Sequence, residues 1–416
     1  PLRQVRRELR AMTTIYLDNA ATTWPKPEEV YRAVDAAMRE HGANPGRASH
    51  RMSVEAQRIV DDARLAVARL FNAPSPDRVV FTLNTTDALN IALKGLIGPG
   101  DRIVAGPYEH NSVMRPLHSL AATGARVAAA RGTAALALDL DHFAELCRVG
   151  VDYVVMAHVS NVTGAVSPVK DVSRITHEHG GRLILDAAQS AGDLEIDVQD
   201  LGVDALAAPG HKGLYGPMGT GVLVLAADLP VKPWREGGTG VHSELAEQPA
   251  DYPWHLEGGT CNLPGIAGLR AGIRFVTSVG VTAMGEHDAM LARVAVEGLR
   301  RIDGVRVLCG PDDPRTGVVS FTVDGLDGAL AAAMLDESAG IAVRSGLHCA
   351  PAAHRALGTF PAGTVRASFG HFNTREHAEA LVATVRAMSA SKWQACGGGL
   401  SDATVGKRSS TRTTGG

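Results

Sequence analysis

The chain has 416 residues, of which 45% are hydrophobic and 20% are charged, and its formal net charge is -3. This composition is typical of a globular protein large enough for two or three domains. The near-neutral charge argues against nucleic acid or an acidic membrane surface as a partner. No apolar run reaches the roughly 18 residues that a membrane span needs.

The five cysteines include no C-x-x-C pair. An odd number without such spacing indicates neither a disulfide framework nor a zinc site, so we expect a cytoplasmic protein without a metal. The basic residues 1–14 are interpreted as an N-terminal extension, in which Met12 is a candidate start. The segment 391–416 is rich in Gly, Ser and Thr and is predicted to be disordered.

Strands and helices alternate between about residues 30 and 265. The predicted strands are continuously apolar, which is typical of a parallel sheet that is covered on both faces. We therefore predict an α/β domain over residues 15–265. Its strands are expected at 78–82, 102–107, 152–160, 182–189 and 203–209, and its helices at 86–96, from 112 onward, and at 169–180.

The pattern changes after Gly265, where an Ala-rich helical segment (266–302) is followed by shorter strands and two further helices. This mixture predicts a smaller α+β domain over residues 266–390. The first residues of the large domain, up to about fifteen, are expected to pack on this small domain.

Two charged residues stand at the ends of predicted strands. Lys212 lies in "APGHKGLYG", and a desolvated lysine can form a Schiff base with a carbonyl cofactor, although most lysines are simply exposed. Asp186 ends the strand "RLILD", where ligands bind in open α/β sheets. Asp186 could pair with the ring nitrogen of a pyridine cofactor, or merely cap local backbone.

Three further features offer both a functional and a structural interpretation. The turn with Thr85 and Thr86 could bind an anion at a helix N-terminus or simply cap that helix. Cys349, close to His348 and Arg344 in sequence, could be an exposed nucleophile or a small buried side chain. Arg366 could bind a carboxylate or form a structural salt bridge.

No G-x-G-x-x-G stands in a strand-to-helix turn, which argues against a nicotinamide cofactor. Nine segments, however, occur in the order seen in the class V aminotransferase superfamily. They resemble most the cysteine desulfurases and selenocysteine lyases with a short "SGLHCAP"-like segment. The nine segments are "IYLDNAATTWPKP", "NTTDALN", "YEHNSV", "SNVTGAVSPV", "LILDAAQSAG", "GHKGLYGPMGTG", "EGGTCNLPGIAGL", "RSGLHCAP" and "VRASFGHFNT".

This resemblance implies a homodimer of fold type I with pyridoxal 5'-phosphate as the cofactor. Lys212 would hold the cofactor covalently, Asp186 would pair with its ring nitrogen, and Cys349 would take up sulfur. The other implied site residues are His110 on the ring face, as a catalytic group that donates or accepts a proton, Asn161 and Gln189 near the phenolic oxygen, Thr85, Thr86 and His211 at the phosphate, Thr260 at the partner subunit's phosphate, and Arg366, with Asn161, at the substrate carboxylate. Pro209 departs from the family pattern, since a hydroxyl residue is usual there.

The resemblance implies conversion of L-cysteine, or L-selenocysteine, to L-alanine, with sulfur passing to a sulfur-acceptor protein or a small thiol. The alternatives are another pyridoxal phosphate reaction, namely that of a C–S lyase, an aminotransferase or an epimerase, or a non-catalytic scaffold. The first group would need Lys212 but not Cys349.

Overall fold

The computed structural model describes residues 14–46, 50–133, 136–309 and 316–397. The predicted N-terminal extension, apart from its last residue, and residues 398–416 of the predicted disordered tail lie outside these ranges. The prediction of disorder is wrong for residues 391–397, which continue the last helix. Over the described ranges the elements alternate as the sequence predicts, and they form two larger sheets and one small strand pair.

The largest sheet has seven strands in the order β2-β8-β7-β6-β5-β3-β4. Five neighbouring strands are parallel, whereas β8 runs antiparallel to both β2 and β7. The prediction of a mostly parallel sheet is therefore confirmed. The strands are β2 (Val79–Thr82), β3 (Arg102–Ala105), β4 (Arg126–Ala129), β5 (Tyr153–Ala157), β6 (Arg182–Asp186), β7 (Ala205–Pro209) and β8 (Gly221–Leu225).

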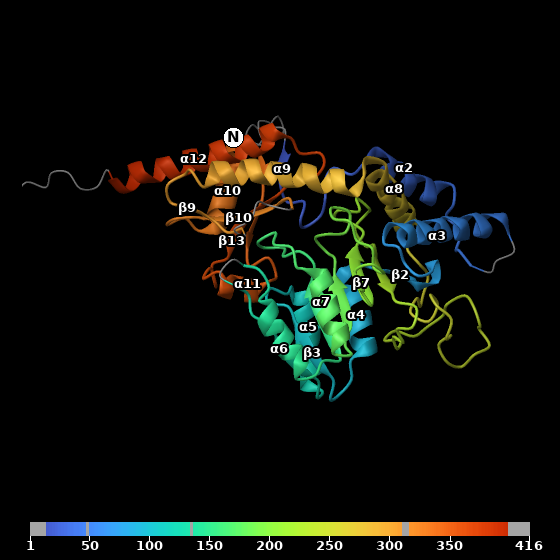
Figure 1. Ribbon diagram of the computed structural model, residues 1–416. Helices are drawn as coiled ribbons and strands as arrows, with labels where there is room; N and C mark the ends of the chain where they lie inside the picture. Colours follow the sequence, from blue (N-terminus) through green and yellow to red (C-terminus); the bar gives the residue numbers. More distant parts are fainter. Residues whose placement is uncertain (1–13, 47–49, 134–135, 310–315, 398–416) are drawn as a thin grey trace, which may run out of the picture.

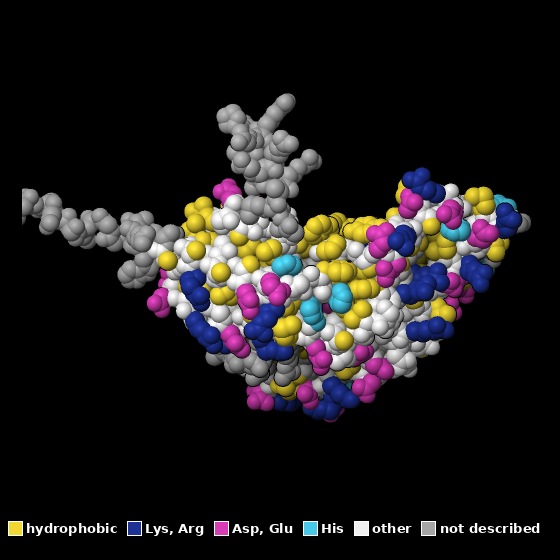
Figure 2. Space-filling model, turned by 90° about the horizontal axis from the view of Figure 1, so that it is seen from above, with side chains coloured by type: hydrophobic (Ala, Val, Ile, Leu, Met, Phe, Trp, Pro, Cys, Tyr) yellow, Lys and Arg dark blue, Asp and Glu magenta, His cyan; other side chains and the backbone are white. Residues whose placement is uncertain are grey.

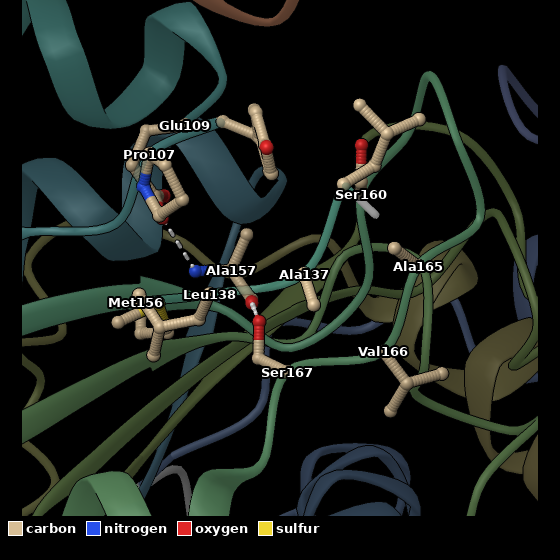
Figure 3. Close-up of a pocket in the computed structure, with 12 residues that line it drawn as sticks. Pro107, Glu109, Ala137, Leu138, Met156, Ala157, Ser160, Ala165, Val166 and Ser167 are labelled. Carbon is tan, nitrogen blue, oxygen red and sulfur yellow. Dashed lines mark hydrogen bonds between the residues drawn. The ribbon is translucent and has the colours of Figure 1, made fainter. Parts of the chain in front are cut away.

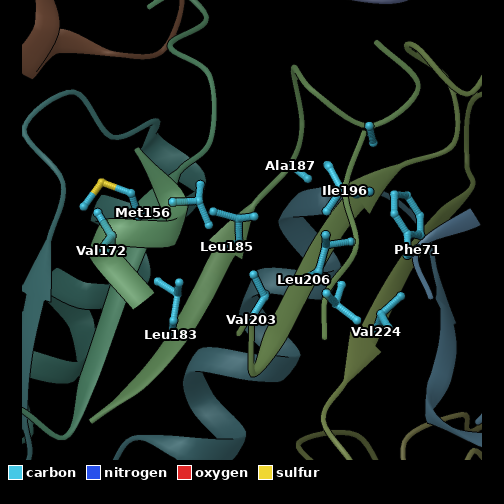
Figure 4. Packing of buried hydrophobic residues seen from close by; sticks show 14 of the residues in the cluster. Phe71, Met156, Val172, Leu183, Leu185, Ala187, Ile196, Val203, Leu206 and Val224 are labelled. Carbon is cyan, nitrogen blue, oxygen red and sulfur yellow. The ribbon is translucent and has the colours of Figure 1, made fainter. Parts of the chain in front are cut away.

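Successive residues of these strands enter two different hydrophobic cores, because neighbouring side chains of a strand point to opposite faces. Leu183 and Leu185 pack on one face, which Figure 4 shows, while Ile184 packs on the other. The first face is covered by α3 (Arg51–Leu70), α6 (Leu140–Arg148), α7 (Val169–Glu178) and α8 (Leu263–Val279), and the second by α4 (Thr85–Leu96) and α5 (Asn111–Ala122). Coverage of both faces explains why the strands are continuously apolar.

The C-terminal part contains a four-stranded antiparallel sheet in the order β12-β13-β10-β9. Three helices supply the core against it, and a short helix precedes β13. The elements are α9 (Val281–Leu299), β9 (Val305–Val307), β10 (Val318–Val323), α10 (Gly328–Ala339), β11 (Ile341–Ala342), β12 (Arg344–Gly346), α11 (Pro351–Ala356), β13 (Thr364–Ser368) and α12 (Arg375–Gly397). Figure 1 shows α9 and α12 side by side along this part.

The single helical segment predicted at 266–302 is two helices. Gly280 lies between α8 and α9 with φ +98, a backbone conformation that L side chains rarely adopt. Because α8 begins at Leu263, the predicted boundary at residue 265 falls in its first turn. The division into two domains stays a prediction.

The beginning of the described chain lies against its C-terminal part. β1 (Ile15–Tyr16) pairs in parallel with β11, and Leu17 enters the hydrophobic core of the four-stranded sheet. The helix α2 (Glu28–Arg39) then packs on α8, and a short 3-10 turn, η1 (Pro76–Arg78), precedes β2.

Charged side chains of both signs are interspersed on the face shown in Figure 2, with hydrophobic groups between them. That face therefore carries no extended patch of a single sign, in keeping with the small net charge. Among the described residues, no helix is both long and apolar enough to cross a membrane.

Candidate functional site

A cavity of about 340 Å³ opens at the carboxyl ends of the parallel strands β5 and β6. This is the position at which open α/β sheets bind ligands. It brings together all but one of the predicted site residues, from both parts of the chain. They are Thr85, Thr86, His110, Asn161, Asp186, Gln189, His211, Lys212, Cys349 and Arg366.

Lys212 follows β7 in a tight turn. Its carbonyl oxygen accepts hydrogen bonds from the Thr23 hydroxyl at 3.0 Å and from the Tyr215 backbone N–H at 2.8 Å. Part of the side chain faces the cavity, yet surrounding protein desolvates the amine and lowers its pKa to about 8. Gly213 is required here, because a Cβ at that position would lie 2.4 Å from the Ala191 carbonyl oxygen. Gly213 therefore lets the lysine turn pack closely against Ala191.

Asp186 ends β6, and its Oδ1 accepts a hydrogen bond from the Ala188 amide at 2.9 Å. It thus makes the local backbone bond that the sequence also allowed, while lining the cavity. Burial raises the pKa of this carboxyl, and the nearby Lys212 opposes that effect. A cation beside Asp186 would hold it in the charged form.

The N-terminus of α4 borders the cavity. Asn84 is its N-cap and accepts a hydrogen bond from the Asp87 amide at 2.9 Å, so the alternative that a threonine caps this helix is wrong. Thr85 Oγ1 is buried and has no hydrogen-bond partner within the described ranges, and the same holds for Nδ1 of His211 on the same cavity. Unpaired buried polar atoms beside a helix N-terminus suit an anionic ligand.

His110 is the N-cap of α5, and its Nδ1 accepts a hydrogen bond from the Ser112 amide at 3.0 Å. Burial, assisted by Lys212, Arg366 and Arg115, lowers the pKa of His110 to about 4. The imidazole is therefore neutral near pH 7. Sequence reasoning missed Ser112, although it stands two residues after His110 in the quoted segment "YEHNSV".

Arg366 lies on β13 and is 2% exposed. Its guanidinium donates to the Asn161 carbonyl oxygen at 3.0 Å and to Asp18 at 3.1 Å, and Asp18 also pairs with Arg344 at 3.1 Å. Its Nε has no partner among the described residues. Arg366 therefore forms a structural ion pair and retains a donor for a carboxylate.

Cys349 is exposed at the cavity rim and follows β12. His348 and Cys349 have φ values of 48 and 56, so two consecutive residues adopt the left-handed conformation, which is costly for non-glycine residues. The side-chain amide of Asn161 donates to the His348 carbonyl oxygen at 2.7 Å, and the backbone N–H of Asn111 donates to the Cys349 carbonyl oxygen at 2.8 Å. These bonds fix the thiol-bearing turn against the large sheet.

Glu109, which sequence reasoning also missed, lies in the loop before α5. Its carboxylate accepts a hydrogen bond from the Ala157 amide at 2.9 Å, as Figure 3 shows, and burial raises its pKa to about 8. A Cβ at Gly106 would lie 2.1 Å from this carboxylate. Glu109 therefore anchors the loop that carries His110 to the end of β5.

Thr260 does not line this cavity. It is exposed in a second cavity of about 710 Å³, which Cys261 and Gly219 also line. The predicted contact of Thr260 with a partner subunit stays a prediction.

Two further predicted positions are occupied as follows. Gln189 donates to the Ala20 carbonyl oxygen at 3.0 Å, and Pro209 ends β7 opposite Gly221.

The fold and the cavity match known proteins. The profile of the family described as aminotransferase class-V matches residues 15–381. A probable cysteine desulfurase from Methanothermobacter thermautotrophicus is 36% identical over 92% of this chain and 96% of its own length.

Solved structures agree with this match. The apo cysteine desulfurase from Thermococcus onnurineus superposes with a TM-score of 0.86 at 34% identity, over 92% of this chain and 98% of that one. The cysteine desulfurase CsdA from Escherichia coli superposes with a TM-score of 0.82 at 30% identity, over 93% and 98%.

The chain thus has the α/β fold of these enzymes, with a lysine-bearing cavity at the carboxyl edge of a mostly parallel sheet. It belongs to the class V aminotransferase family.

Proposed function

We propose that this chain is a pyridoxal phosphate-dependent cysteine desulfurase, which converts L-cysteine to L-alanine and transfers the sulfur to Cys349. The observation that carries the proposal is that one cavity joins buried Asp186 and desolvated Lys212 to an exposed thiol. A lysine alone would fit many reactions of this family. The thiol at the rim favours sulfur transfer among them.

The described residues fit pyridoxal phosphate. Lys212 offers an amine of lowered pKa, and Asp186 offers a buried carboxyl for a protonated ring nitrogen. The unpaired Thr85 hydroxyl and the N-terminus of α4 suit a phosphate, without a hydroxyl at Pro209. Thr86, His211 and Gln189 would complete the binding, and His110 would cover the ring. When bound, the cofactor would supply an electron sink for the substrate carbon.

Arg366 would orient the substrate, because its unpaired Nε and buried guanidinium suit the substrate carboxylate. Asn161 would lie beside that carboxylate. Lys212, once free, would take the proton from the substrate Cα. The Cys349 sulfur would then attack the substrate sulfur, forming an S–S bond while the substrate C–S bond breaks. The electron pair of that bond stays with the carbon, which is protonated to give alanine.

The outer sulfur of the Cys349 persulfide would pass to a sulfur-acceptor protein or a small thiol, because Cys349 is exposed at the cavity rim. L-Selenocysteine would enter by the same contacts. We further propose that the enzyme is a cytoplasmic homodimer in which Thr260 reaches the phosphate of the partner's cofactor. This assignment is supported by the position of Thr260, which is exposed and lies outside the Lys212 cavity of the same chain.

The test is mass spectrometry of the chain after incubation with L-cysteine or L-selenocysteine, with alanine measured in parallel. We expect a persulfide, or its selenium equivalent, on Cys349, and loss of alanine formation in Cys349→Ser. Cys309→Ser, which changes a partly buried thiol elsewhere, is the matched control. Alanine formation at the full rate in Cys349→Ser would instead indicate another reaction of the family, one that needs only Lys212.

A further inference from the structure

Three side chains that line the Lys212 cavity form a continuous chain of hydrogen bonds. Thr86 Oγ1 lies 2.7 Å from Ser112 Oγ, and Ser112 Oγ lies 2.8 Å from Nδ1 of His110. Ser112 is only 8% exposed, and all three residues line the cavity. The chain therefore joins the N-terminus of α4 to the imidazole at the start of α5.

The direction of this chain follows from its donors. The Ser112 backbone N–H donates to Nδ1 of His110, so Nδ1 carries no proton. A hydroxyl oxygen 2.8 Å from an unprotonated nitrogen must place its own hydrogen between them, so Ser112 Oγ donates to Nδ1. The Ser112 proton is then committed, and Thr86 must donate to Ser112.

We propose that Ser112 is a positioning residue, whose hydroxyl, supported by that of Thr86, fixes His110 as the neutral tautomer with its proton on Nε2. His110 then presents an N–H donor to the cavity and is no general base. Its role as a group beside the substrate rests on the proposed function, whereas the tautomer itself does not.

The same direction has a consequence for Thr86. Its only hydroxyl proton points to Ser112, so Thr86 binds an anion through its backbone N–H and not through its hydroxyl. Replacing Ser112 by Ala frees that proton for the anion. A residue with a merely structural role would weaken anion binding when it is removed, whereas Ser112→Ala is expected to strengthen it.

The first experiment measures the ring-nitrogen resonances of His110 by NMR in the full chain, assigned by their loss in His110→Gln. We expect a pyrrole-type Nε2 and a pyridine-type Nδ1 in the wild type, in which the pKa of His110 is about 4. Ser112→Ala removes one of two donors to Nδ1, so the pKa rises by roughly one unit. Ser112→Thr, which keeps the hydroxyl, restores it, and Ser119→Ala on the exposed side of α5 leaves it unchanged.

A proton on Nδ1 in the wild type would overturn the proposal, and this measurement needs no variant to fold. An unchanged pKa of His110 in Ser112→Ala would overturn it too. Neither result depends on desulfurase activity, so failure here is distinguishable from failure of the proposed function.

The second experiment titrates the cofactor-free chain with inorganic phosphate. We expect the phosphate Kd to fall about fivefold in Ser112→Ala, the effect of one additional hydrogen bond. It should return to the wild-type value when Thr86→Val is added. A higher Kd in Ser112→Ala alone would contradict the deduced direction of the chain.

Discussion

Lys212 and Cys349 line the same cavity, yet their surroundings are opposite. Lys212 follows a buried strand of the large sheet, and desolvation lowers its pKa to about 8. Cys349 is exposed, and its turn is held by hydrogen bonds from the Asn161 side-chain amide and the Asn111 backbone N–H. The comparison teaches that a group reacting within the cavity needs desolvation, whereas a group that must meet a second partner needs accessibility at a fixed position.

The largest effect that separates the two residues is expected from Lys212→Ala. Cofactor absorbance and alanine formation should both be lost, the rate falling ten-thousandfold or more, roughly as for removal of a covalent catalyst. Alkylation of Cys349 by iodoacetamide should continue at the wild-type rate, measured by mass spectrometry. A large change in that rate would mean that the two groups are not independent.

The protonation of Lys212 can be measured through stability. The amine releases its proton near pH 8 in the folded chain and near 10.5 in the unfolded chain. Between these values the unfolded state binds more protons, so the free energy of unfolding of the cofactor-free chain rises with pH. The total gain is about 3 kcal/mol.

Urea unfolding at a series of pH values checks this, with Lys212→Met as the reference. Below pH 8 both states are protonated, and Lys212 contributes no slope there. Identical pH dependence in the two chains would show that Lys212 is not desolvated.

Arg366→Lys tests the contact that would place the substrate between the two groups. A lysine cannot reproduce the planar guanidinium, so kcat/KM for L-cysteine should fall about a hundredfold, or 2–3 kcal/mol. The loss should lie mostly in KM, and cofactor absorbance should be retained. An unchanged KM would leave Arg366 with only its ion pair to Asp18.

The smallest effect is expected from Asn161→Ala, which removes the hydrogen bond to the His348 carbonyl oxygen. The turn of Cys349 should loosen, and persulfide formation should slow about tenfold. Steady-state kinetics and persulfide mass spectrometry measure this. Loss of cofactor binding in this variant would shift the role of Asn161 from the thiol to the cofactor.

Much of the large sheet could be predicted because its strands are buried on both faces and therefore appear as apolar runs. The half-exposed edge strand β4 has no such run, and the reversed direction of β8 leaves no trace in its composition. The break at Gly280 was hidden in a continuous Ala-rich pattern, since a glycine within a helix is also tolerated.

The site was predictable where a chemically distinctive residue ends a strand, as Asp186 does, or follows one closely, as Lys212 does. Cys349 could not be placed from sequence, because free cysteines are buried more often than exposed. Ser112 and Glu109 were missed because their importance depends on partners that lie far away in sequence or across a turn. A buried glutamate or serine beside a site histidine is a signal that could have found them.

The pairing of β1 with β11 also determines how late in synthesis the first strand can find its partner. Ile15 meets Ile341, so 326 residues separate the partners, and at roughly 5–20 residues per second the ribosome needs about 15 to 65 seconds to deliver the second one. The ion pair of Asp18 with Arg366 completes later still. The large sheet can therefore form first, while Ile15, Tyr16 and Leu17 stay unpaired until β11 has been synthesised. Cys349 and Arg366 follow β11 in the chain, so the cavity is complete only after this strand pair can form.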